Sequence, residues 1–345
     1  MSKRIAKLAP VVAIVVSTLM LLAPAAEAQS LNLLCNATID WCELMKNKFE
    51  AETGIKTAMT RRSSGESYAQ VRAESANPKI DVWWGGTGDP HLQAAGEGLT
   101  EVYKSPSLSK LQPWANKVAE ASGNRTVGIY LGALGYSYND KMLASKKLAA
   151  PKCWSDLTDA KYKDEVQMPD PNSSGTAYTM LATLVQLMGE EKAFAFMKSM
   201  HKNVNQYTKS GVAPSQAVGR GETLIGISFM HDLIVPKLAG FPVTVVAPCE
   251  GTGFEIGSMS IIKGARNMIE AKRFYEFALR PDIQSLAPSV KAYQIPSNLE
   301  AKVSAESIKP SDVKLIDYDQ VKYGSTEVRR HLLKRWSDEI SGAPR

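Results

Sequence analysis

The sequence lacks the motifs on which hydrolytic and nucleotide-dependent enzymes depend. It contains no Gly-x-Ser-x-Gly elbow, no phosphate-binding P-loop and no His-Glu-x-x-His pair. Ser63 and Ser64, with His231 and Asp232, are the residue types of a hydrolytic triad. We place His231 and Asp232 side by side at the end of a strand, where neighbouring side chains point to opposite faces, so Asp232 could not orient His231. The sequence therefore predicts a protein that is not an enzyme.

Histidine and cysteine are scarce, with four of each in 345 residues. None of them falls at the spacing of zinc ligands, so we expect no metal site. The formal net charge of +6 is mild and lacks the clustered basic stripe of nucleic-acid-binding proteins. It is compatible with a small anionic solute and argues against a nucleic-acid partner.

The N-terminus resembles an export signal. Three basic residues open the chain: Lys3, Arg4 and Lys7. An apolar run follows over 8–25, and Ala26-Glu27-Ala28 is a small-x-small site at which cleavage would leave a mature chain beginning at Gln29. An uncleaved membrane anchor is the alternative, because the run nearly reaches the ~20 residues of a spanning helix; Pro24 favours cleavage. We expect a soluble periplasmic protein, since no later segment is apolar enough to cross a bilayer.

The four cysteines predict two disulfides, because exported proteins meet an oxidising compartment. Cys35 and Cys42 lie close together in the sequence, where a strand turns into a helix, so we favour this pair. Cys153 and Cys249 then form the other. Two further pairings, and four reduced cysteines, remain as alternatives.

Two lobes are expected, because the chain after residue 28 exceeds the roughly 250–300 residues at which a single core stops growing. The first part alternates strands and helices in the order of an open parallel sheet. The expected strands are 31–34, 55–60 and 80–84, and the expected helices are 41–53 and 68–75. Ligands bind beyond the carboxyl ends of such strands, which makes 36–37, 61–65 and 85–88 candidate segments.

A second block begins with an apolar strand over 127–138 that leaves the first lobe. Later strands are expected at 166–169, 223–229, 241–247 and 256–262, and helices at 177–188, 190–201, 265–279 and 321–340. The last strand and the last two helices are assigned to the first lobe. Lobe 1 is thus 29–128 with 257–345, and lobe 2 is 129–256. Two crossings between lobes form a hinge that can close around a solute.

Several motifs occur in the order found in a known family of transport receptors. They are Asp81-Val82-Trp83-Trp84-Gly85-Gly86, Trp154-Ser155-Asp156-Leu157, Pro169-Asp170-Pro171 with Ser173-Ser174-Gly175-Thr176, and Gly253-Phe254-Glu255-Ile256-Gly257. The chain resembles the ferric-binding-protein-like class of ABC-transporter receptors over nearly all of its mature length. This resemblance implies an α/β type II periplasmic-binding-protein fold, with two doubly wound lobes and a two-crossing hinge. It also implies a partner permease with its ATPase; we expect a monomer without a cofactor.

The ligand needs a separate argument. Ferric receptors of this class use two consecutive tyrosines, whereas this sequence has no Tyr-Tyr pair and Tyr207 lies between Gln206 and Thr208. A hard trivalent cation needs several anionic oxygens, so the missing pair argues against iron. His231, Asp232 and Glu255 instead look like a trio found in the related hexose-phosphate receptors. Carboxylates accept hydrogen bonds from sugar hydroxyls, which supports the same ligand class.

A phosphate group suits helix N-termini, where unpaired N–H groups and the helix dipole meet an anion. Ser and Gly residues precede two expected helices, although such residues are more often simple caps. The predicted solute-binding residues are Ser63, Ser64, Gly65, Gly86, Thr87, Ser174, Gly175, Thr176, His231, Asp232 and Glu255. The predicted solute is a hexose phosphate. Ferric ion, a phosphonate or another organic anion are the alternatives, and a polyamine would want more acids and an aromatic box.

Overall fold

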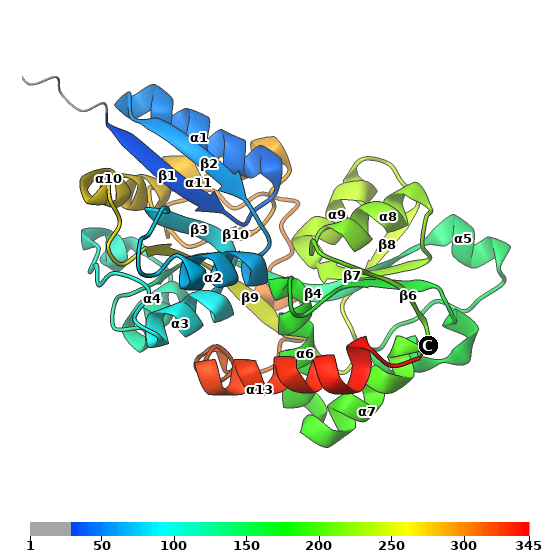
Figure 1. Cartoon of the computed structure of the whole chain (residues 1–345). Helices are drawn as coiled ribbons and strands as arrows, with labels where there is room; N and C mark the ends of the chain where they lie inside the picture. The colour runs from blue at the N-terminus through cyan, green and yellow to red at the C-terminus, as the bar shows by residue number, and fades with distance from the viewer. Residues whose placement is uncertain (1–28, 345) are drawn as a thin grey trace, which may run out of the picture.

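The computed structural model describes residues 29–344, so the expected export signal lies outside the described residues. Figure 1 shows two lobes side by side, each built of strands with helices packed around them. Among residues 29–344, no helix has the length and apolarity that spanning a membrane requires.

The first lobe is a mostly parallel sheet in the order β2-β1-β3-β9-β4, in which β9 runs antiparallel to its neighbours. Its strands are β1 (Ser30–Cys35), β2 (Lys56–Arg61), β3 (Val82–Thr87), β9 (Phe254–Ile261) and the short β10 (Ile295–Pro296). Its helices are α1 (Ile39–Thr53), α2 (Ser64–Ala73), α3 (Gly88–Gly96), α4 (Pro113–Ala121), α10 (Met268–Ala278) and α11 (Pro281–Gln284). Leu33 packs in one core with Phe49, and Leu34 packs in another with Tyr68. Both faces of β1 are therefore covered, which explains its uninterrupted apolar sequence.

The second lobe continues the strand order as β4-β7-β5-β6, with β8 paired to β4. Its strands are β4 (Val127–Asn139), β5 (Val166–Pro169), β6 (Val204–Thr208), β7 (Ile225–Phe229) and β8 (Val243–Val246). Its helices are α5 (Asp140–Ser145), α6 (Gly175–Met188), α7 (Glu190–His201), α8 (Ala213–Arg220) and α9 (Met230–Leu238). A fully buried core around Trp154, Tyr178 and Phe194 holds them together.

One long strand joins the two sheets. The first half of β4, from Val127 to Ala133, pairs with β9, and the second half, from Leu134 to Asn139, pairs with β7 and β8. The predicted strand leaving the first lobe and the predicted return through β9 are thus both present. The architecture is the expected α/β arrangement of two lobes.

The C-terminal segment differs from the expectation of one helix over 321–340 in the first lobe. It forms α12 (Gln320–Tyr323), α13 (Thr326–Trp336) and a π-helical turn (Ser337–Ser341). Gly324 and Ser325 interrupt the helix, and Leu332, Trp336 and Ile340 pack in the core of the second lobe. The helical periodicity indicated a buried face but not which lobe would cover it. The chain therefore passes between the lobes a third time, after β10.

Helix α13 also contacts the first lobe. Arg329 Nε lies 2.7 Å from Asp89 Oδ2 on α3, and both side chains are buried. The same guanidinium lies 4.7 Å from the ring centroid of Tyr178 on α6. Figure 1 shows α13 running beneath both lobes, so it ties one to the other.

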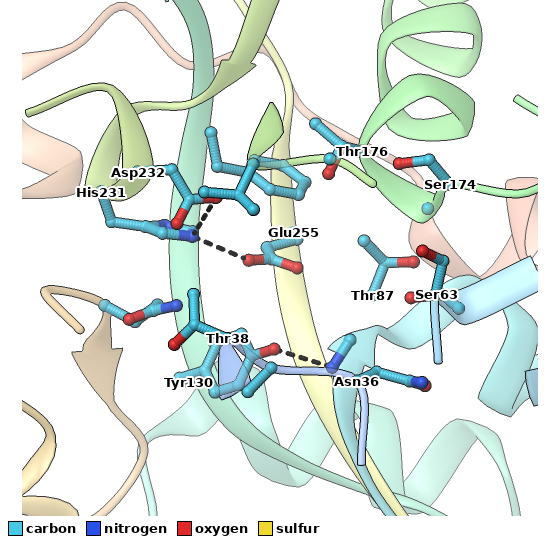
Figure 2. A pocket seen from close by; sticks show the side chains of 18 of the residues that line it. Asn36, Thr38, Ser63, Thr87, Tyr130, Ser174, Thr176, His231, Asp232 and Glu255 are labelled. Atoms are coloured by element: carbon cyan, nitrogen blue, oxygen red, sulfur yellow. Dashed lines mark hydrogen bonds and ion pairs between the residues drawn. The ribbon is translucent and has the colours of Figure 1, made fainter. Parts of the chain in front are cut away.

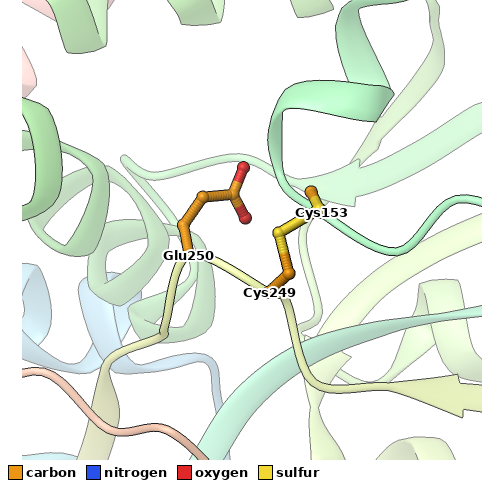
Figure 3. Close-up of side chains that lie close together, drawn as sticks. All are labelled: Cys153, Cys249 and Glu250. Carbon is orange, nitrogen blue, oxygen red and sulfur yellow. A yellow bond between two sulfur atoms is a disulfide. The ribbon is translucent and has the colours of Figure 1, made fainter.

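Both predicted disulfides are confirmed, Cys35 with Cys42 and Cys153 with Cys249. Figure 3 shows Glu250 beside the second one. These three side chains are close enough to share a metal ion, but the two sulfurs are bonded to each other. The Glu250 carboxylate accepts hydrogen bonds from Trp154 N at 2.7 Å and Ser155 N at 2.9 Å. This cluster therefore joins two loops of the second lobe.

Candidate functional site

A cavity of about 60 Å³ lies between the lobes, and both lobes line it. Beside it the lobes contact each other directly: Gly65 N donates to Ser173 O at 2.9 Å, and Ser63 Oγ donates to Lys209 O at 2.9 Å. The structure thus shows the two lobes closed on the cavity. Figure 2 shows two groups of polar side chains around it, one rich in hydroxyls and one containing carboxyls.

The hydroxyl-rich end receives side chains from both lobes. Four hydroxyls there have no hydrogen-bond partner within residues 29–344, and all four belong to buried residues. They are those of Ser64, Thr87, Ser174 and Thr176, of which Thr87 Oγ1 is itself fully buried. Buried polar groups are nearly always hydrogen-bonded, so this cluster indicates a place for a polar partner.

The local folding explains why these hydroxyls meet. Thr87 ends β3 and is the N-cap of α3, and Ser174 is the N-cap of α6, yet neither uses its side chain to cap its helix. A Cβ on Gly175 would lie 2.0 Å from Thr87 Oγ1, so only glycine lets the two lobes come this close. A Cβ on Gly86, which has φ +78°, would lie 2.4 Å from Ser64 Oγ. The N-terminal ends of α2, α3 and α6 therefore converge, and their dipoles favour an anion.

The other end of the cavity holds His231, Asp232 and Glu255. His231 Nε2 lies 3.6 Å from Asp232 Oδ2 and 3.5 Å from Glu255 Oε1. These distances are too long for good hydrogen bonds, so both carboxyls retain capacity to accept others. The imidazole ring lies against Gly132, where a Cβ would be 2.3 Å from His231 Nδ1.

His231 and Asp232 do not lie on a strand. Strand β7 ends at Phe229, and both residues belong to the first turn of α9. The expectation that their side chains point to opposite faces is therefore wrong, since both side chains line the same cavity. His231 Nδ1 makes no hydrogen bond among residues 29–344, so neither Ser63 nor Ser64 forms a triad with it.

Burial sets the charges at this end. It raises the pKa of Asp232 to about 7, against a weaker opposing effect of the Ser228 hydrogen bond and the Arg61 charge. Burial, and then the Asp232 charge, raises the pKa of Glu255 well above its ordinary value. Burial lowers the pKa of His231 to about 3. The imidazole is therefore neutral near pH 7, and the two carboxyls resist being ionised together.

All the predicted solute-binding residues line the cavity except Gly65. Its N–H group is used in the contact with Ser173 O, and a Cβ there would lie 2.3 Å from Asn172 O, so Gly65 serves lobe contact. The prediction omitted several lining residues, among them Thr38, Arg61, Tyr130 and Gln294. Thr38 and Arg61 adjoin or lie within the candidate segments after β1 and β2. Tyr130 in mid-strand and Gln294 before β10 carry no local signal.

Comparison with known proteins places the chain in a family. The model of the bacterial extracellular solute-binding protein family matches residues 77–323. An uncharacterized protein of Haemophilus influenzae is 45% identical over 333 residues, covering 94% of this chain and 96% of that protein. The spermidine/putrescine-binding periplasmic protein of Escherichia coli is 23% identical over 307 residues, covering 86% of this chain and 83% of that protein.

A solved structure agrees with this placement. It is the periplasmic binding protein AfuA from Actinobacillus pleuropneumoniae with exogenous fructose-6-phosphate bound. The TM-score is 0.90 and the identity 44%, covering 92% of this chain and 100% of that one. The chain therefore belongs to the bacterial extracellular solute-binding protein family, as a periplasmic substrate-binding receptor of an ABC importer.

Proposed function

We propose that this receptor captures a hexose phosphate in the cavity between its lobes. The observation that carries the proposal is the pairing of two chemically different ends in one closed site. One end offers unpartnered hydroxyls and helix N-termini, and the other offers two carboxyls and a neutral imidazole. The 44% identity to a protein whose structure holds fructose-6-phosphate supports the same ligand class.

The phosphate group fits the hydroxyl-rich end. Within residues 29–344 no acidic residue lines that end, and the hydroxyls of Ser64, Thr87, Ser174 and Thr176 can each donate to a phosphate oxygen. Helix N-termini favour an anion without a full positive charge. Because α2 and α3 belong to the first lobe and α6 to the second, a bound phosphate would hold the lobes together.

The sugar fits the carboxyl end. Sugar hydroxyls both donate and accept hydrogen bonds, and Asp232 and Glu255 can both accept from them, with a charge-assisted bond at the carboxyl that is ionised. His231 is neutral and offers one donor and one acceptor. A hydroxyl donor would stabilise the ionised form of Asp232, whose pKa is raised by burial in the structure.

Other ligands fit less well. A polyamine carries several positive charges, whereas the cavity offers two carboxyls with raised pKa values and includes Arg61 among its lining residues. Ferric ion would need more anionic oxygens than Asp232 and Glu255 supply. A phosphonate would satisfy the hydroxyl-rich end but would leave the carboxyl end without hydroxyls to bind.

Calorimetry of the mature protein with a hexose phosphate, the free hexose, inorganic phosphate, a phosphonate, spermidine and ferric citrate tests the proposal. We expect the hexose phosphate to bind most tightly and to stabilise the fold by about 2.7 kcal/mol at a hundredfold excess over Kd. Asp232→Ala or Glu255→Ala should cost about 1.5–3 kcal/mol for the hexose phosphate and much less for inorganic phosphate. Ser64→Ala or Thr176→Ala should weaken all phosphorylated ligands modestly. Equal binding of the hexose phosphate by wild type and both carboxyl variants would exclude this solute class.

The remaining features follow from the same role. We propose that the chain is exported with cleavage after Ala28, acts as a monomer and delivers its solute to a membrane permease with a cytoplasmic ATPase. Release of inorganic phosphate from a hexose phosphate in the presence of the purified protein would contradict a role without chemistry.

A further inference from the structure

Tyr130 is held rigidly at the hinge. It lies in the half of β4 that pairs with β9, and its side chain is buried. Its ring covers Gly257 of β9, where a Cβ would lie 2.0 Å from the Tyr130 Cε2 atom. Its ring centroid lies 5.2 Å from that of Trp41. The ring is thus packed between two fixed groups, and its hydroxyl has one position.

The Tyr130 hydroxyl accepts a hydrogen bond from Gly86 N at 2.8 Å, drawn in Figure 2. This is its only hydrogen bond among residues 29–344. Because Gly86 N donates, the hydrogen of the Tyr130 hydroxyl has no acceptor among the described residues. The residue lines the cavity, so that hydrogen is available to a solute.

A buried histidine fixes the turn that presents Gly86. His91 Nε2 lies 3.1 Å from Gly85 O, and His91 Nδ1 lies 2.8 Å from Ser260 Oγ. Burial lowers the pKa of His91 to about 3, so the ring is neutral near pH 7 and carries one N–H. A carbonyl oxygen can only accept, so Nε2 donates to Gly85 O and Nδ1 accepts from Ser260. The turn between β3 and α3 is therefore locked in place beside Tyr130.

We propose that Tyr130 recognises the sugar end of the solute: its hydroxyl donates a hydrogen bond to a solute hydroxyl, and that solute hydroxyl donates to Glu255. This inference rests on the proposed function and adds a recognition residue to it. The carboxyl end supplies acceptors through Asp232 and Glu255, and a sugar hydroxyl needs a donor as well. A phosphate oxygen would not serve at this position, because it has no hydrogen to donate to Glu255.

Tyr130→Phe tests the inference because it removes the hydroxyl and keeps the ring on Gly257. The control is Tyr136→Phe, on the same strand, whose hydroxyl donates to Cys153 O at 3.3 Å outside the cavity. By calorimetry with a hexose phosphate, we expect Tyr130→Phe to weaken binding about three- to tenfold, the range of a neutral hydrogen bond. We expect Tyr136→Phe to bind as wild type does.

A series of monodeoxy hexose phosphates separates recognition from a structural effect. One deoxy analogue, lacking the hydroxyl that Tyr130 contacts, should bind wild type and Tyr130→Phe equally, and that analogue should also show the smallest loss with Glu255→Gln. The inference is overturned if Tyr130→Phe binds the parent hexose phosphate as tightly as wild type, or if its loss is the same for every analogue. A wild-type protein that binds no hexose phosphate refutes the proposed function itself, and this inference with it.

Discussion

Replacing Asp232 by asparagine should strengthen the fold while weakening the site. Burial raises the pKa of this carboxyl from 3.8 to about 7. The folded protein therefore holds a proton more tightly than the unfolded chain, and stability is lost as the pH rises from about 4 to 7. Each pKa unit corresponds to about 1.4 kcal/mol, so the cost above pH 7 has a ceiling of about 4 kcal/mol.

Asparagine has the same shape and no charge, so it removes this cost. We expect Asp232→Asn to stabilise the ligand-free protein by about 1–3 kcal/mol at pH 8, less than the ceiling because Glu255 is buried beside it and shares the proton. The gain should vanish below pH 4, where Asp232 is protonated in both states. Binding of a hexose phosphate should fall at least tenfold in the same variant.

Urea unfolding of the ligand-free wild type and variant at pH 4, 6 and 8 measures the gain, with the exposed Asp317→Asn as a control that should change little. The reasoning is refuted if the difference in unfolding free energy between variant and wild type is the same at all three pH values, because the carboxyl would then carry no burial cost. A variant that gains stability and still binds the solute normally would separate Asp232 from recognition.

Three further predictions concern other residues. Burial lowers the pKa of His91 to about 3, so the unfolding free energy of the wild type should fall as the pH falls below about 6.5. In urea titrations at a series of pH values, His91→Gln should show a smaller fall over this range. Arg329→Met should cost about 3–5 kcal/mol in unfolding free energy because it leaves Asp89 buried and unpaired, and Arg329→Met with Asp89→Asn should recover much of it. Ferric citrate should produce no visible tyrosinate-to-iron colour in the purified protein; one equivalent giving a salmon-red solution would restore iron as the ligand.

Most strands could be predicted because their apolar residues are contiguous in the sequence. Strands β6 and β10 were not expected, because β6 is largely polar and β10 has only two residues. Helix α7 was expected at 190–201 and is observed at those bounds. Helix α2 begins at Ser64 rather than near Tyr68, because its first turn is polar and faces the cavity and the other lobe, where no apolar period marks it. Patterns of this kind report burial and say little about which partner provides it.

Some residues of the candidate site could be predicted from the sequence and others could not. Ser174 and Thr176 were predictable because a Ser/Thr/Gly turn follows an expected strand in a fold whose ligands bind there. Tyr130 was not, because its role depends on contacts with Gly86, 44 residues earlier, and with Gly257 on another strand. The placement of His231 and Asp232 on a helix also required the structure, since Met230 continues the apolar run of β7.

The two ends of the described chain lie in different lobes. Gln29 adjoins β1 in the first lobe, whereas Ala343 O accepts a hydrogen bond from His201 Nε2 in the second at 3.0 Å. Hinge opening would therefore change the separation of the ends, and a donor and an acceptor fluorophore attached there would convert solute capture into an optical signal. Since α13 lies between the C-terminus and the lobe interface, the linker on that side would need to begin beyond Ala343 to leave the helix intact.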